Sequence, residues 1–271
     1  MGILLDGVDD LFSVSDNSDF DVGSGDFAIS FRVKGPITGA NGAVIQLSAE
    51  TGGHGAIIGY VAGTDFRMFL SSNGSTFDIA SNTTMGQRPT SGVVENYMLM
   101  RSGNTFTTYK GTAQTNTFTN SSSIFHTPAP LQIGRDFAGG AAQFSINGLI
   151  EGLFVWKGVS LSSIEREIIV NSNIKNIELQ IQPANIVAGW GFCGGPDGDS
   201  ADGDVLIDLT GNGNDAIGDD GANNSGLTWK AEDILSYPVS PVFINTSIGG
   251  NSGALLNAGL LGGKLQHRLI G

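Results

Sequence analysis

The sequence predicts an all-β domain of short strands, and three observations support this. Glycine fills 41 of the 271 positions and charged residues only 14%, a composition typical of many tight turns. The early part of the chain alternates apolar and polar residues with period two, as a half-buried strand does. No internal repeat of about 20 to 50 residues is present, so a solenoid or propeller is not expected. The apolar face of the clearest strand consists of Phe27, Ile29, Phe31 and Val33.

Two strands open the chain. Residues 11–14 alternate in the same way as residues 27–33. Residues 15–25, between them, are rich in Asp, Asn, Ser and Gly, which bond their own backbone or tolerate positive φ. The sequence therefore predicts a strand, a loop and a second strand.

Further strands follow in order. We expect a strand at residues 43–48, a hairpin pairing residues 56–61 with 66–70, and a short edge strand at residues 77–80. A second hairpin is expected between residues 96–101 and 105–109, because the three-residue connection Ser102-Gly103-Asn104 is of a kind favoured in hairpins.

One helix is expected at residues 160–171, where the apolar period changes from two to about 3.6. Ser160 and Ser162 are both suitable N-caps. Since a short amphipathic helix buries one face, its expected role is packing. The apolar face would consist of Leu161, Ile164, Ile168 and Ile169.

Several stretches share the pattern of a known family. They are Leu-Asp-Gly-Val-Asp-Asp from residue 4 with Gly-Asp-Phe-Ala-Ile-Ser-Phe-Arg-Val from residue 25, the hairpin at 97–109, Leu-Gln-Ile-Gly from residue 131, and the strand at 144–156. Together they resemble the concanavalin A-like lectin/glucanase superfamily in its laminin-G-like branch. The resemblance implies a two-sheet antiparallel jelly-roll sandwich with one short helix and, in this chain, a C-terminal extension.

The order of the segments differs from the family's common order. Residues 189–229 resemble the strand and turn that usually precede the Leu-Asp-Gly-Val-Asp-Asp strand, and here they come last. The resemblance therefore implies a circularly permuted domain at residues 1–237, in which residues 186–229 return beside the N-terminal strand. Jelly rolls have neighbouring termini, so such a rearrangement is tolerable.

The charge pattern excludes some partners. A formal net charge of −13 repels phosphate backbones and anionic lipid, so neither nucleic acid nor membrane is an expected partner. No apolar run reaches the roughly 18 residues of a membrane span, and the acidic N-terminus does not match a secretory signal. The single cysteine, Cys193, lies in an apolar run and is expected to be a buried thiol.

Catalysis is not expected. Retaining glycosidases need two carboxyl groups roughly 5 Å apart, and on this fold the family carries them in Glu-x-Asp-x-Glu or Glu-x-Asp-x-x-Glu runs. No such run exists here, and the three histidines are far apart in sequence. The sequence therefore predicts a non-enzymatic protein.

A calcium site is one candidate feature. Crowded carboxylates on a glycine-containing loop suit the six to eight oxygens that calcium takes, although the loop departs from the EF-hand pattern at its fifth, sixth and last positions. A solvated acidic loop is the alternative. The candidate ligands are Asp197, Asp199, Asp202, Asp204 and Asp208. The Asp6, Asp9 and Asp10 group has the same standing as a metal candidate.

The three tryptophans are candidates for stacking on sugars. Trp156 and Trp190 lie within apolar strands at positions that match core residues of the family, so we expect them in the core. Trp229 ends a polar loop, and both a core and a carbohydrate-stacking role are open for it.

The C-terminal segment, residues 238–271, is rich in glycine and leucine. We expect it to be a docking tail toward copies of the chain or other proteins, most simply as a homo-oligomer; packing on its own domain is the alternative. The residues expected to dock are Leu255, Leu256, Leu260, Leu261, Leu265 and Leu269.

Two function classes follow from the resemblance. The first is a structural protein of a tailed-bacteriophage virion, a head or tail fibre, spike or decoration component, which displays a lectin-like domain toward host-surface carbohydrate and needs no export signal. The alternative is a carbohydrate-binding module of a bacterial surface or secreted protein. Virion localisation accompanies the first interpretation.

Overall fold

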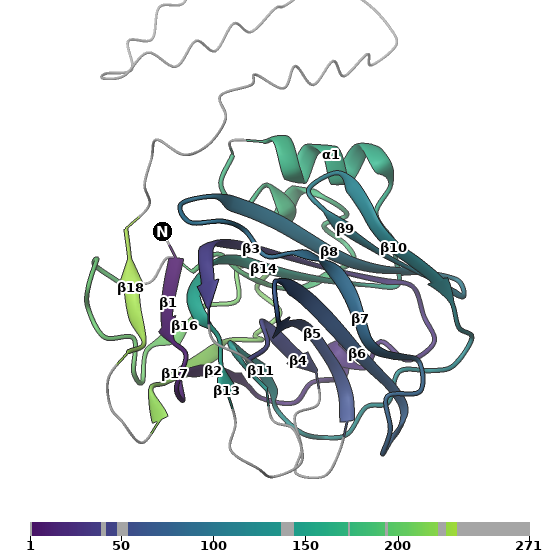
Figure 1. The fold of residues 1–271 in the computed structure, drawn as a ribbon, viewed down its shortest axis with the longest axis horizontal. Coiled ribbons are helices and arrows are strands. Elements are labelled where there is room, and N and C mark those ends of the chain that lie inside the picture. Colours follow the sequence, from purple (N-terminus) through teal and green to yellow (C-terminus); the bar gives the residue numbers. More distant parts are fainter. Residues whose placement is uncertain are drawn as a thin grey trace, which may run out of the picture.

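The computed structural model describes residues 2–38, 42–47, 54–136, 144–172, 174–192, 195–221 and 226–231. Within these ranges the chain forms two stacked antiparallel sheets and one α-helix (Figure 1). This is the two-sheet jelly-roll sandwich that the sequence predicts. The docking tail at residues 238–271 and Cys193 lie outside the described residues. No helix in the described ranges has the length and apolar character needed to cross a membrane.

Sheet A has the strand order β10-β9-β8-β3-β14-β1-β18, with β15 paired to β14. Its strands are β1 (Gly2–Asp6), β3 (Phe27–Thr38), β8 (Val94–Ser102), β9 (Thr105–Lys110), β10 (Ala113–Thr119), β14 (Asn147–Lys157), β15 (Ile186–Trp190) and β18 (Thr228–Lys230). Sheet B has the order β16-β17-β2-β11-β4-β5-β6-β7. Its strands are β2 (Leu11–Val14), β4 (Ile45–Leu47), β5 (His54–Ala62), β6 (Asp65–Gly74), β7 (Ala80–Gln87), β11 (Leu131–Ile133), β16 (Val205–Leu206) and β17 (Ala216–Asp219). The short strands β12 (Arg135–Asp136) and β13 (Phe144–Ser145) pair with each other, and the 3₁₀ helix η1 (Ser18–Phe20) lies in the opening loop.

The main core lies between the two sheets. The alternation of β3 buries its predicted face completely, since Phe27, Ile29, Phe31 and Val33 are all at most 1% exposed. The ring of Phe31 stacks on Tyr97 of β8 at 5.3 Å and meets Phe66 of β6 edge-on at 5.6 Å. Aromatic contacts of this kind therefore join the two sheets.

The outer face of sheet A is covered by the helix α1 (Ser163–Asn171) and the 3₁₀ helix η2 (Ile177–Gln180). Ser162 is the N-cap and forms a capping box with Glu165, so of the two serines considered as caps Ser162 has this role. Trp156 is fully buried in this second core, and its indole N–H donates to the carbonyl of Ile181 at 2.8 Å. Ile164 is 68% exposed, so its predicted place on the buried face is wrong.

The segment before the C-terminal tail returns to the start of the chain. β17 pairs with β2, and β18 pairs with β1, so both opening strands receive a partner from residues 216–230. The first strand of the returning segment, β15, pairs with β14 instead. Circular permutation of the family's common order stays a prediction.

The hairpins expected at residues 56–70 and 96–109 are present as β5–β6 and β8–β9. The edge strand expected at residues 77–80 is misplaced, because β7 begins at Ala80 and Phe77 lies in the preceding connection. Sheet B therefore ends in the long, largely polar strand β7, and its outer face carries no helix among the described residues.

Candidate functional site

The outer face of sheet B carries a row of half-buried aromatic side chains. Along β6, Phe66, Met68 and Leu70 point into the core, so Phe69, in the opposite phase, points outward. Tyr60 of β5 faces the same way, because it pairs across the strands with the outward Arg67 rather than with the buried Phe66.

Phe77 completes this row from the β6–β7 connection. The ring of Tyr60 meets that of Phe69 edge-on, with the ring centroids 5.1 Å apart. The ring centroids of Phe69 and Phe77 are 5.0 Å apart. We call Tyr60, Phe69 and Phe77 the aromatic row. The sequence of β6 could have indicated the aromatic row, because Phe69 stands among the alternate residues of the strand that are otherwise polar, Asp65, Arg67 and Ser71.

Polar groups flank the aromatic row on the same face. The guanidinium of Arg67 donates to the carbonyl of Asn82 at 3.0 Å and lies 3.5 Å from a carboxylate oxygen of Asp65. Thr84 of β7, opposite Arg67 in the register, donates its hydroxyl to Asp65 at 3.5 Å. Arg67 and Asp65 are 29% and 24% exposed, so this network presents donors and acceptors beside the rings.

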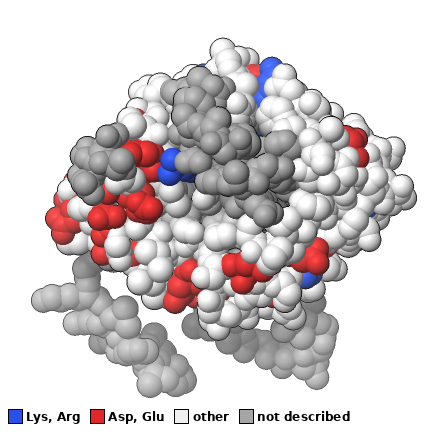
Figure 2. Space-filling model, turned by 90° about the horizontal axis from the view of Figure 1, so that it is seen from below, with Lys and Arg blue, Asp and Glu red and all other residues white. Residues whose placement is uncertain are grey.

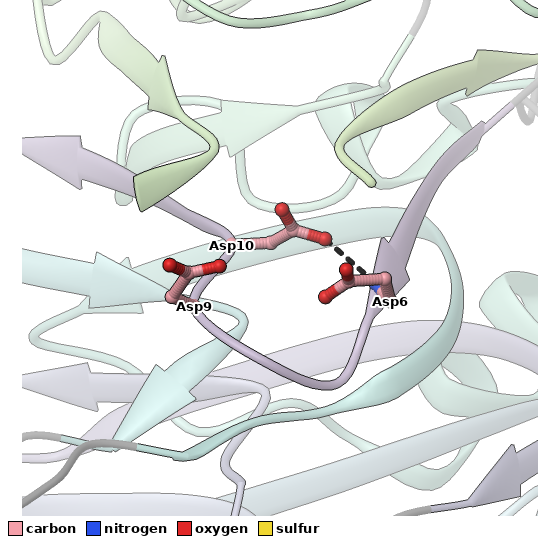
Figure 3. A group of neighbouring side chains, drawn as sticks. All are labelled: Asp6, Asp9 and Asp10. Atoms are coloured by element: carbon pink, nitrogen blue, oxygen red, sulfur yellow. Dashed lines mark hydrogen bonds between the residues drawn. The ribbon is translucent and has the colours of Figure 1, made fainter. Parts of the chain in front are cut away.

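A cluster of carboxylates lies at the opposite end of sheet B. Figure 2 views the molecule from the side on which the sheet B strands lie in Figure 1, and acidic side chains gather there at the left, over the end that holds β2 and β17. Asp6, Asp9 and Asp10 of the β1–β2 turn each offer an oxygen within 4.8 Å of the other two (Figure 3). We call these three residues the acidic cluster.

Asp10 is the buried member of the acidic cluster. It is 0% exposed, and one of its carboxylate oxygens accepts the backbone N–H of Asp6 at 2.6 Å. The pKa of Asp10 is raised to about 7, chiefly by burial; the hydrogen bond from the backbone N–H of Asp6 lowers it, and the neighbouring charges of Asp6 and Asp9 contribute to the rise. The sequence-derived metal hypothesis for this group is thus matched by a close approach of the three side chains.

The other predicted calcium ligands do not converge. The only described metal-compatible group that includes one of them joins Asp202 to Asp219 and Asp220 at the end of β17. Asp197 instead accepts the backbone N–H of Ala231 at 3.1 Å, and it lines a pocket of about 530 Å³ between β1, β14 and β18. Among the described residues, the five predicted calcium ligands Asp197, Asp199, Asp202, Asp204 and Asp208 therefore do not form one metal-compatible group, which corrects the calcium-loop prediction.

Asp208 has a structural role that excludes it as a ligand. It is 3% exposed, and its two carboxylate oxygens accept the N–H of Gly189 at 3.0 Å, the N–H and hydroxyl of Thr210, and the N–H of Asn214 at 3.2 Å. Because these donors fill the carboxylate, the Asp208-to-Asn214 turn is a hydrogen-bonded clamp on β15.

Trp229 is a core residue, which corrects its candidate role as a sugar-stacking platform. It is 1% exposed, because it is the inward-facing residue of β18, in phase with the buried Leu227 just before the strand. Its ring lies 6.4 Å from that of Phe12, and a Cβ added at Gly195 would come within 2.1 Å of the indole. The ring faces are therefore covered by the domain itself.

Trp190 is fully buried as expected, and its indole N–H donates to the carbonyl of Asn214 at 2.9 Å. The docking leucines, Leu255, Leu256, Leu260, Leu261, Leu265 and Leu269, lie outside the described residues, so their role stays a prediction.

Comparison with known proteins identifies the fold. No protein-family model matches the sequence, and no curated protein does. Among solved structures, a Bacteroides ovatus protein provisionally assigned to carbohydrate binding matches with a TM-score of 0.55 and 11% identity, over 86% of this chain and 60% of that protein. The chain thus spans less than two thirds of the Bacteroides protein.

Two further structures match with lower scores. The CBM40 of a Ruminococcus gnavus sialidase matches with a TM-score of 0.45 and 15% identity, over 62% of this chain and 96% of that one. Domains LG4-5 of the mouse laminin α1 chain match with a TM-score of 0.42 and 14% identity, over 57% of this chain and 40% of that one. The chain has the two-sheet antiparallel jelly-roll fold that the sequence predicts, and the Bacteroides ovatus structure is similar to it in fold.

Proposed function

We propose that this chain is a carbohydrate-binding domain that holds its ligand against the outer face of sheet B. The observation that carries the proposal is the aromatic row, in which Tyr60, Phe69 and Phe77 form two consecutive ring contacts on a sheet face turned away from the core. The fold supports it, since the Bacteroides ovatus protein with the same fold is provisionally assigned to carbohydrate binding.

The chemistry of the face suits a sugar. A sugar ring has apolar C–H faces and a rim of hydroxyl groups, so its recognition requires flat apolar surfaces beside fixed polar groups. The aromatic row supplies the first. Arg67 and Asp65 supply the second, because a guanidinium only donates hydrogen bonds and a carboxylate only accepts them, whereas each sugar hydroxyl can do both.

The competing outer face supports the choice of sheet B. On sheet A, α1 and η2 cover β3, β8, β9 and β14 through a second apolar core that includes Trp156 and Tyr109. An aromatic residue there packs against the helix instead of a ligand. On sheet B the aromatic row is half-buried without such a helix among the described elements.

In this proposal the domain binds without cleaving its ligand. The motivation is the sequence, which lacks the alternating Glu and Asp run of the fold's glycosidases. Release of reducing ends from a bound oligosaccharide, at a rate above a no-protein blank and lost in a carboxylate variant, would contradict this part of the proposal.

The finer prediction of a bacteriophage virion protein stays a prediction. The structural neighbours named above support the alternative interpretation, a carbohydrate-binding module, and we therefore place that interpretation first. Self-association through the C-terminal tail belongs to the same untested prediction.

A glycan array followed by calorimetric titration tests the proposed function. The parent chain is expected to retain a restricted set of glycans, and Phe69→Ala is expected to weaken the best of them at least about tenfold, as truncation of a central aromatic anchor does. Phe118→Ala is the matched control, because Phe118 is also partly buried but packs at the edge of sheet A. Equal affinities of the parent and Phe69→Ala, or no glycan retained by the folded parent, would refute the proposal.

A further inference from the structure

The β1–β2 turn positions the acidic cluster through its backbone. The N–H of Val8 donates to a carboxylate oxygen of Asp6 at 2.8 Å, which closes the turn on itself. Asn147 donates to the carbonyl of Asp6 at 2.7 Å, and Arg135 donates to the carbonyl of Asp9 at 3.2 Å. The carbonyl oxygens of Asp6 and Asp9 are thus engaged by the protein, while their carboxylates belong to the acidic cluster.

The carboxylates of the acidic cluster converge. Figure 3 shows Asp6 and Asp9 directed toward each other with Asp10 between them. A cation of the calcium type binds oxygens at about 2.3 to 2.6 Å, so two ligands on opposite sides of one ion lie about 4.6 to 5.2 Å apart. The separation of at most 4.8 Å among the three residues fits a single ion.

A second, independent observation points to a missing ligand. The Oδ1 atom of Asp10 is buried and has no hydrogen-bond partner among the described residues, although the residue is 0% exposed. A buried carboxylate oxygen without a partner is costly, and the cost grows when further carboxylates lie beside it. A positive ion would supply both the missing partner and the missing charge.

The acidic cluster is also enclosed. A Cβ added at Gly221 would lie 2.4 Å from Oδ2 of Asp9, and one added at Gly226 would lie 2.5 Å from Oδ2 of Asp6. The backbone on both sides of the β17–β18 connection therefore packs directly on two of the three carboxylates. Any side chain larger than hydrogen at either glycine would push them apart.

We propose that Asp6, Asp9 and Asp10 bind one divalent cation of the calcium type, which ties the β1–β2 turn to the returning β17–β18 segment. The ion would satisfy Oδ1 of Asp10 and offset the repulsion among the three carboxylates. The neighbouring group of Asp202, Asp219 and Asp220 has no comparable unpartnered buried oxygen among the described residues, so the assignment is to the acidic cluster alone.

Calorimetric titration and thermal unfolding test the site. After treatment with EDTA, the parent chain is expected to bind one calcium ion, and its Tm is expected to rise by about 5 to 10 °C at a calcium concentration about 100 times Kd. Magnesium is expected to give a smaller rise, because it requires stricter octahedral geometry. Absence of binding by the folded parent would overturn the proposal, and an equal rise with magnesium would overturn the assignment to calcium.

Asp10→Asn separates a cation site from a purely structural carboxylate. The variant is expected to melt above the parent in EDTA, because it removes a buried charge, and to lose at least tenfold in calcium affinity. Asp199→Asn changes an exposed acid outside the cluster and should bind as the parent does. If Asp10→Asn does not fold, Asp9→Asn, at a half-exposed position, provides the same comparison. Unchanged calcium affinity in a folded Asp10→Asn or Asp9→Asn variant would overturn the site.

Discussion

The indole N–H of Trp229 donates a hydrogen bond of 2.8 Å to Oδ2 of Asp204. The bond joins β18 to the acidic loop before β16. One of these residues was a candidate for stacking on sugar and the other a candidate for binding calcium. In the folded domain the indole N–H of Trp229 and the carboxylate of Asp204 form a hydrogen bond with each other. The aromatic row on the outer face of sheet B is now the candidate carbohydrate site, and the acidic cluster in the β1–β2 turn is the candidate metal site.

Asp204→Ala tests this bond. The substitution leaves the buried indole N–H without an acceptor, which typically costs about 1 to 3 kcal/mol. Urea unfolding should show that loss as a lower midpoint with an unchanged slope. Asp199→Ala removes an exposed acid from the same loop and should change the free energy of unfolding by less than about 0.5 kcal/mol. Equal midpoints for the two variants would contradict a structural role for Asp204.

Asp208→Ala tests the clamp on β15. The substitution removes a carboxylate that accepts from Gly189, Thr210 and Asn214, and hydrogen bonds to charged groups contribute about 1.5 to 3 kcal/mol each. We expect a loss of about 3 to 5 kcal/mol in the free energy of unfolding, because several of these donors remain buried. The loss should be the same in calcium and in EDTA. A loss seen only with calcium present would restore Asp208 as a metal ligand.

The Arg32–Glu178 pair under η2 gives a pH-dependent prediction. Nη2 of Arg32 lies 2.9 Å from Oε1 of Glu178, whose side chain is 1% exposed. Burial raises the pKa of Glu178 above its ordinary value of 4.5, and the charge of Arg32 opposes that rise. The folded state therefore holds this proton more tightly than the unfolded state, and the stability contribution of Glu178 falls as pH rises through 4.5 toward the raised pKa.

Glu178→Gln should remove this part of the pH dependence. Urea unfolding of the parent and the variant between pH 4 and 8 measures it, since a tenfold difference in proton affinity between the folded and unfolded states is worth about 1.4 kcal/mol. The free energy of unfolding of the parent, relative to that of the variant, is expected to decline over the window above pH 4.5. The quantity to compare is the slope of the free energy of unfolding against pH. The absolute free energies also differ, because Glu178→Gln removes the charged partner of Arg32. Parallel profiles would show that Glu178 titrates as it does in the unfolded chain.

The fold was predictable from the sequence because it depends on local patterns. The alternation of residues 27–33, the hairpin connection at residues 102–104 and the capping box at Ser162 each specify one element with little help from the rest of the chain. The resemblance to a known family then supplied the arrangement of these elements. The prediction that Ile164 is buried was wrong, because a helix turn with several apolar residues does not specify which of them faces the sheet.

The candidate site was harder to predict, because its residues come together only through strand pairing. Phe69 and Tyr60 become neighbours across β5 and β6, and Phe77 joins them from a connection. The acidic cluster was visible as three nearby aspartates, but the unpartnered oxygen of Asp10 was not. The acidic residues at 197–208 led to a wrong calcium prediction, because their closeness in the sequence does not show how each carboxylate is bonded. The carboxylate of Asp208, for example, accepts hydrogen bonds from the backbone N–H groups of Gly189 and Asn214.

Amide hydrogen–deuterium exchange with and without bound glycan tests the central claim most directly. The ligand is the glycan that the parent chain retains best, at a concentration that saturates it. We predict slower exchange in β5, β6 and β7 around Tyr60, Phe69 and Phe77, with no change in β9 and β10 of sheet A. Protection that leaves β5–β7 unchanged and falls on residues 195–221 or on sheet A would contradict the claim that the aromatic row holds the sugar.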